Sequence, residues 1–233
     1  MRTVIAMVML AGLAPAAGAQ PILASRTPTD QPANGLSTSG VPSRDGAFTL
    51  FTSTATDMVP GYDTILDLYR FERATGVVLR ANLPRTRASS SLFPGGISAD
   101  GRFAVFTSND ATLVPGDTNG VNDVFLYDWQ AGTTTLVSRA ANGAVGNDFS
   151  YGVEISGDGS RVVFTTRARN FSTVDNGVAE DVFLWQRDTG ALTLVSRGAD
   201  GEPANGYSVF SHINDAGTLV TFSSSASNLT TGT

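Results

Sequence analysis

The sequence predicts an all-β fold, a β-propeller of four-stranded antiparallel blades, because two segments recur along the chain. The first segment is present four times: VPSRDGAFTLFTS from Val41, ISADGRFAVFTS from Ile97, ISGDGSRVVFTT from Ile155 and INDAGTLVTFSS from Ile213. The second, as in DVFLYDWQAG, starts at Asp67, Asp123 and Asp181. Self-similarity at a fixed period indicates structural units that stack on their neighbours.

Each unit contains four predicted strands. In the second unit they are a short strand ending at Ile97, then residues 102–108, 123–129 and 133–139. The Asp100-Gly101 pair suits a tight hairpin in which both turn positions have positive φ. Apolar residues run almost continuously through the second and third strands, as in sheets buried on both faces. We therefore expect propeller blades; a β-sandwich is the alternative, but a sandwich does not require repetition.

The repeats divide the chain after residue 19. Residues 39–94, 95–152 and 153–210 are predicted blades, and residues 211–233 a partial blade. Residues 20–38 form an orphan outer strand and loop, because Ile22 to Arg26 matches the Ser-Arg ending of a fourth strand. We expect this strand to complete the last blade of a ring and protect its edge. The missing third strand of the last unit favours a fragment of a larger ring over four irregular blades that close on themselves.

The segments ISADGRFAVFTS, DVFLYDWQAG and TLVSR resemble the WD40-like (PD40-type) repeats of TolB-like β-propellers. The resemblance covers nearly the whole chain after residue 19. Two departures are Ala216 in place of the turn aspartate, and the first unit's outer strand near Gly76, which lacks the Ser-Arg ending. The resemblance implies a binding scaffold in the cell envelope whose partner is a protein or an envelope component. It is specific for the fold and weak for the function, since such repeats occur in proteins of many roles.

The first residues predict export. Arg2 precedes an uncharged run that ends in Ala17-Gly18-Ala19, so residues 1–19 read as a signal peptide and the mature chain as periplasmic or extracellular. A membrane anchor is the alternative, but the run is short for a span. After cleavage no membrane span is expected, and the oligomeric state is not predicted. The chain has no cysteine, and its net charge of -6 disfavours a nucleic-acid partner.

The acidic loops are the recurrent polar feature of the sequence. Asp117, Asn119 and Asp123 place oxygen atoms close together, as a calcium site requires, and Asp175, Asn176 and Asp181 repeat the arrangement. These residue types are also ordinary turn formers, and we expect the repeated aspartates to bond backbone amides where each third strand begins. Turn formation is the favoured interpretation, with calcium as the only candidate cofactor.

Catalytic candidates are few. Nucleophilic catalysis needs a base, and His212 is the one histidine; it precedes Ile213 in a predicted inner strand and faces the central channel or solvent. Trp129 has arginines at its counterparts and is a candidate exposed aromatic, whereas Tyr127 is expected to pack between blades. We expect a non-catalytic binding scaffold. A propeller hydrolase or lyase using His212, and a calcium-binding extracellular module, are the alternatives.

Overall fold

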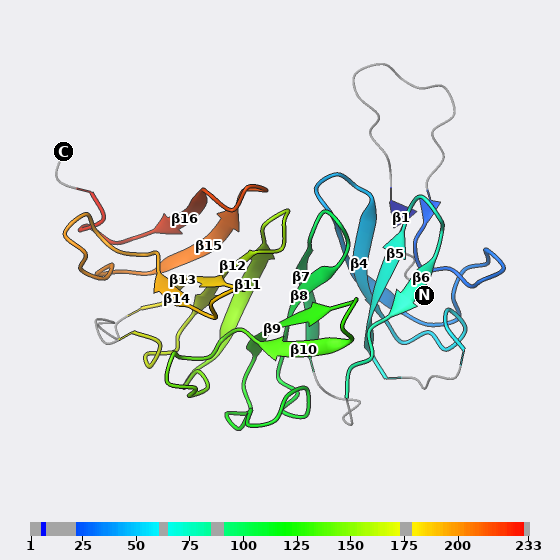
Figure 1. The fold of residues 1–233 in the computed structure, drawn as a ribbon, viewed down its shortest axis with the longest axis horizontal. Helices are drawn as coiled ribbons and strands as arrows, with labels where there is room; N and C mark the ends of the chain where they lie inside the picture. The colour runs from blue at the N-terminus through cyan, green and yellow to red at the C-terminus, as the bar shows by residue number, and fades with distance from the viewer. Residues whose placement is uncertain (1–5, 8–21, 61–64, 85–90, 173–178, 231–233) are drawn as a thin grey trace, which may run out of the picture.

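The computed structural model describes residues 6–7, 22–60, 65–84, 91–172 and 179–230. The described chain forms three four-stranded antiparallel sheets side by side and a two-stranded fourth unit, so the predicted fold class, a propeller of four-stranded antiparallel blades, is confirmed (Figure 1). Within each blade the strands pair in chain order. The described sheets form an open arc and do not close into a ring.

The blades have these strands, from inside to outside. Blade 1 contains β3 (Ser37–Pro42), β4 (Phe48–Ser53), β5 (Asp67–Glu72) and β6 (Val78–Arg80). Blade 2 contains β7 (Leu92–Ile97), β8 (Phe103–Ser108), β9 (Asp123–Asp128) and β10 (Thr133–Leu136). Blade 3 contains β11 (Ser150–Ile155), β12 (Arg161–Thr166), β13 (Asp181–Gln186) and β14 (Leu192–Leu194). The fourth unit contains β15 (Ser208–Ile213) and β16 (Val220–Ser224).

The hairpin between the first two strands of each blade differs from the predicted turn. In blade 2 only Gly101 has positive φ, +70°, and Asp100 does not, so the prediction of two positive φ values was wrong. The reason is the length of the turn. The amide of Gly101 donates to the carbonyl of Ser98, which closes a four-residue turn with glycine in last place. The Asp100 carboxylate accepts the Ser98 hydroxyl at 2.5 Å and the Arg102 amide at 2.9 Å.

The turn glycines also hold neighbouring blades together. A Cβ on Gly101 would lie 2.6 Å from the ring of Phe48, and a Cβ on Gly159 would lie 2.5 Å from the ring of Phe103. Phe48 and Phe103 occupy the same repeat position, two residues after their own turn glycine. A phenylalanine of one blade thus packs against the turn glycine of the next blade. Continuous burial of β8 and β9 agrees with sheets covered on both faces.

A serine joins the third and fourth strands of blades 2 and 3. The Ser138 hydroxyl donates to Asp123 Oδ1 at 2.6 Å and accepts the Val124 amide at 3.0 Å. Ser196 and Asp181 repeat the arrangement at 2.7 Å. In blade 2 the repeated aspartate therefore bonds the serine hydroxyl, and it is the serine that accepts the backbone amide, which corrects the sequence-based expectation for Asp123. Blade 1 lacks the serine, and Arg80 bonds Asp67 instead.

The N-terminal part of the described chain contains a corner like those that follow β10 and β14. Its β2 (Ile22–Leu23) pairs with β1 (Ala6–Met7). Arg26 then bridges Pro32, as Arg139 bridges Val145 and Arg197 bridges Pro203. The predicted signal peptide, residues 1–19, lies outside the described residues except for β1. Among the residues that are described, none belongs to a helix long and apolar enough to cross a membrane.

Candidate functional site

The inner strands β3, β7, β11 and β15 line a cavity of about 460 Å³. Each of these strands carries a β-bulge in its middle. Val41, Gly96, Glu154 and His212 occupy the same repeat position, directly before the last residue of the strand, and all four line the cavity. The repeat that builds the blades therefore leaves one position on the channel face free to vary.

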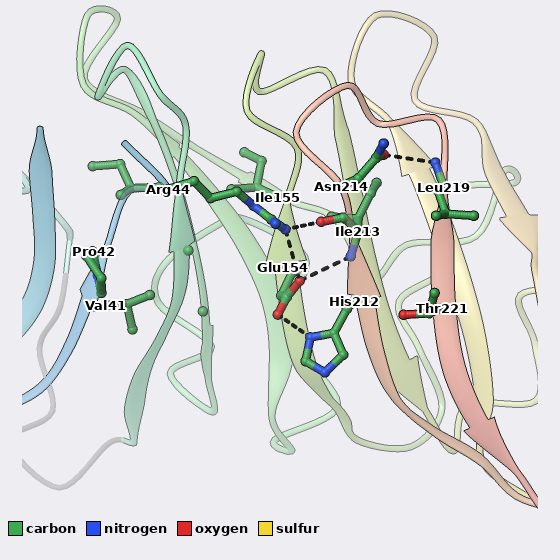
Figure 2. A pocket seen from close by; sticks show the side chains of 13 residues that line it. Val41, Pro42, Arg44, Glu154, Ile155, His212, Ile213, Asn214, Leu219 and Thr221 are labelled. Atoms are coloured by element: carbon green, nitrogen blue, oxygen red, sulfur yellow. Dashed lines mark hydrogen bonds and ion pairs between the residues drawn. The ribbon is translucent and has the colours of Figure 1, made fainter. Parts of the chain in front are cut away.

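Charged side chains from three blades meet at this cavity (Figure 2). Arg44, in the turn after β3, places Nε 2.9 Å from Asp215 Oδ1 and donates to the carbonyl of Ile213. Glu154 of β11 lies 3.7 Å from Arg44 and accepts the Ile213 amide at 3.1 Å. Its other oxygen, Oε1, is 2.7 Å from His212 Nδ1. The cavity combines an apolar floor with a charged rim whose groups are paired with one another.

His212 faces the channel, as the sequence suggested, and its side chain is 67% exposed. Within the described residues its one hydrogen bond is to Glu154, and no serine, threonine or other nucleophile bonds the ring. Sequence reasoning missed Arg44, Glu154 and Asp215. The available signal was that Glu154 and His212 depart from the repeat at equivalent positions of adjacent blades.

The structure brings the proposed calcium residues together. Asn119 and Asp123 bond each other, whereas Oδ1 of Asp117 is buried without a hydrogen-bond partner among the described residues. Asn119 donates its side-chain amide to Asp123 Oδ2 at 2.7 Å, and Ser138 occupies Oδ1. Burial raises the pKa of Asp123 to about 6 and also raises the pKa of Asp117. Among the described residues no group of three histidine, cysteine or acidic side chains is arranged to hold a metal ion. The calcium site stays a prediction, and Asp175 and Asn176 lie outside the described residues.

Trp129 is half-buried and its ring is covered. Arg70 of blade 1 lies over the indole at 5.1 Å, and Tyr127 meets it edge-on at 5.1 Å. Trp129 therefore belongs to the contact between blades 1 and 2, which corrects its interpretation as an exposed aromatic. Tyr127 is buried between the same blades, as expected, and its hydroxyl accepts the Asn82 amide at 2.9 Å.

Three antiparallel blades around an inner channel define the chain as a β-propeller, and its fold is TolB-like. The structure of a protein assigned as a TolB from Agrobacterium tumefaciens matches with a TM-score of 0.54 and 16% identity. The match covers 91% of this chain and 61% of that one, so the chain spans less than two thirds of its length.

Two further structures match with lower TM-scores. TolB from Acinetobacter baumannii has a TM-score of 0.42 and 18% identity, over 83% of this chain and 43% of that one. The tricorn protease has a TM-score of 0.47 and 14% identity, over 81% of this chain and 19% of that one. No protein-family model and no curated protein matches the sequence. These likenesses concern the fold, and they include both TolB and an enzyme.

Proposed function

We propose that the chain belongs to an exported, non-catalytic propeller that binds a protein or another envelope component at its channel face. The observation that carries the proposal is the variable position on the inner strands, where Glu154 and His212 replace the uncharged Val41 and Gly96. Blade packing does not require these charges, because the same position in blades 1 and 2 lacks them. Residues that the scaffold does not need, gathered at one cavity, are typical of a binding site.

The chemistry of the cavity supports binding rather than turnover. Its volume of about 460 Å³ lies within the usual range of ligand pockets. Apolar residues such as Val41 and Leu219 provide contact area, and the rim supplies orientation through Arg44. Because the charges of the rim are already paired, a ligand meets a preorganised surface.

Site-specific photocrosslinking tests the proposal. A photoreactive residue at Leu219, which lines the cavity, is expected to capture a partner in cells, whereas one at Leu79 on the outer strand is not. The purified partner should then bind Glu154→Gln more weakly than wild type and Leu79→Ala as well as wild type. Capture from Leu79 alone, or equal binding by all three proteins, would contradict the proposal.

A hydrolase or lyase is the second candidate, and the Glu154–His212 pair is the observation in its favour. A carboxylate that accepts the Nδ1 proton leaves Nε2 available as a general base. Hydrolysis or elimination by the purified chain that disappears in both His212→Ala and Glu154→Gln would establish this function. Activity that survives both substitutions would not belong to this pair.

A further inference from the structure

A second cavity of about 300 Å³ adjoins the Glu154–His212 pair on the channel side of blade 3. Phe93 of β7 and Phe210 of β15 line it, and these residues are 55% and 72% exposed. Gly152 of β11 lies between them in blade order and presents no side chain. The cavity is therefore a groove with aromatic walls, which we call the phenyl groove.

Phe210 has an unfavourable backbone conformation. Its φ is +54°, and the same repeat position has φ +58° at Ser39 and +61° at Gly152. Pro94, at this position of blade 2, has no positive φ, so the conformation is shared by three of the four inner strands. Glycine accepts it readily and a bulky residue does not. The ring is mostly exposed, so burial does not compensate for the strain. An aromatic side chain retained under strain at a channel is typical of a residue that contacts a ligand.

Two polar side chains in the lining of the phenyl groove have hydrogen-bonding capacity that the described fold does not use. Ser211 is 3% exposed, and its hydroxyl has no hydrogen-bond partner among the described residues. A buried hydroxyl without a partner is unusual in a native fold. Next to it, His212 Nδ1 is bonded to Glu154, so that Nε2 of the neutral ring is a hydrogen-bond acceptor. The groove thus joins two aromatic walls to a short polar segment.

We propose that the phenyl groove binds a tyrosine-type side chain of a peptide segment, its ring between Phe93 and Phe210 and its hydroxyl bonded to His212 and, once the buried Ser211 hydroxyl rotates into the groove, to Ser211. The proposal rests on the proposed binding function and names the chemistry of the partner. Charge complementarity favours this occupant. Arg44 pairs with Asp215 and Glu154, so an incoming cation would compete with an existing ion pair and an anion would meet Glu154. A phenol hydroxyl is a neutral hydrogen-bond donor, so it neither competes with the ion pair nor is repelled by Glu154.

A sugar fits the phenyl groove less well than a phenol. A sugar ring carries hydroxyl groups around its edge and needs polar partners on several sides. The walls include two phenyl rings without hydrogen-bonding groups. The polar side chains of the lining come from Ser211 and His212 at consecutive positions, from Glu154 beside them and from Thr107, which is buried. A ring with one polar tip matches this division between apolar walls and a polar end.

The test uses blocked tripeptides and the full chain, labelled with ¹⁵N and followed by NMR. Acetyl-Gly-Tyr-Gly-amide is expected to produce saturable shifts at Phe93, Gly152 and Phe210. It should bind about fivefold more tightly than the phenylalanine peptide, and the alanine peptide should not saturate. In Ser211→Ala the preference for tyrosine over phenylalanine should fall. A lysine peptide or maltotriose that binds the groove as tightly as the tyrosine peptide would overturn the proposal.

Phe210→Gly separates binding from stability. Glycine relieves the positive φ, so this variant should melt at a higher temperature than wild type while binding the tyrosine peptide about threefold to tenfold more weakly. Leu79→Ala on the outer strand should bind as wild type does. Unchanged binding by Phe210→Gly would refute the proposal. If a captured protein partner still depended on Glu154 in that case, the channel-face function would stand and only the tyrosine assignment would fall.

Discussion

At the scale of single residues, the turn glycines show how the repeat specifies a contact between blades. Gly159 has φ +69° and lies against Phe103, whereas Gly190 has φ +66° and has no atom within 4 Å of the position of a Cβ. These two glycines differ in packing and not in backbone conformation. The difference in stability between alanine substitutions at Gly159 and Gly190 therefore measures the contribution of packing.

We expect Gly190→Ala to lower the free energy of unfolding by about 1 kcal/mol, from backbone strain alone. Gly159→Ala should lower it by a further 1 to 3 kcal/mol or so, because the Cβ displaces the ring of Phe103. Urea denaturation of both variants gives the two values. Equal losses would mean that the blades move apart at no cost and that the contact with Phe103 does not stabilise the fold.

The buried carboxyl of Asp123 makes stability depend on pH. Burial raises the pKa of Asp123 in the folded protein to about 6. In an unfolded chain, where water surrounds the carboxyl, its pKa is 3.8. The folded state therefore holds the proton more tightly, and ionisation of Asp123 removes stability as the pH rises from about 4 to about 6.

We expect Asp123→Asn to lack this loss. The difference in the free energy of unfolding, variant minus wild type, should increase by up to about 3 kcal/mol as the pH rises through this window. The change in hydrogen bonding to Ser138 adds an offset that does not vary with pH, so the slope of the difference is what tests the prediction. Urea denaturation at several pH values measures it, and parallel stability profiles would contradict it.

At the scale of elements, the strands were predictable and their turns only in part. The apolar runs at Phe103–Ser108 and Asp123–Asp128 gave the two central strands of blade 2 to within a residue. The hairpin type was missed, because a DG pair occurs in both two-residue and longer turns. What distinguishes them here is the Ser98 hydroxyl, which bonds the Asp100 carboxylate.

The loop between β8 and β9 carries the calcium prediction. Asp123 is engaged by Asn119 and Ser138, so a metal ion would have to displace two hydrogen-bond donors. We expect millimolar calcium, and its removal by a chelator, to move the melting temperature by less than about 1 °C. Differential scanning calorimetry of wild type and Asp117→Asn provides the comparison. A calcium-dependent rise in wild type that is absent in the variant would show that the loop binds the ion.

The segment ILASR was predicted to be an outer strand, and the corner that follows β2 has the geometry of a folded segment. The Thr27 amide donates to the carbonyl of Gln31 at 2.8 Å, and the Ala33 amide to that of Ser25 at 3.1 Å. Ala140 makes the corresponding bond to Ala144. We expect the amides of Thr27 and Ala33 to exchange hydrogen as slowly as that of Ala140, within about tenfold. Exchange at the rate of an unfolded chain would show a mobile leader; the closing-strand role remains a prediction.

At the scale of the whole molecule, the sequence predicts what repeats and misses what does not. Four copies of one segment sufficed for the propeller, because stacking units share one set of packing positions. The candidate site depends on contacts between blades, such as Glu154 with His212 at a separation of 58 residues. No local pattern joins them. Only the alignment of equivalent positions, once the fold is known, places both on the channel face.

Arg44 links distant parts of the arc. It belongs to blade 1 and bonds Ile213 and Asp215 in the fourth unit, which lies at the other end of the described sheets (Figure 1). Because the guanidinium is about half exposed, solvent screens these bonds, and the free energy of unfolding should fall by less than about 1 kcal/mol in Arg44→Ala. The larger effect should be on the relative position of the blades.

The absence of cysteine allows spin labels to be introduced at Leu79→Cys in blade 1 and Ser223→Cys in the fourth unit. We expect pulsed electron resonance to show a broader distribution of distances between these labels in Arg44→Ala than in the wild-type background. Arg102→Ala is the matched control, because Arg102 bonds Asp128 at 2.8 Å within blade 2 and joins no distant blades. An unchanged distribution in Arg44→Ala, or equal broadening in the control, would mean that packing between adjacent blades alone fixes the curvature of the arc and that the channel rim does not contribute to it.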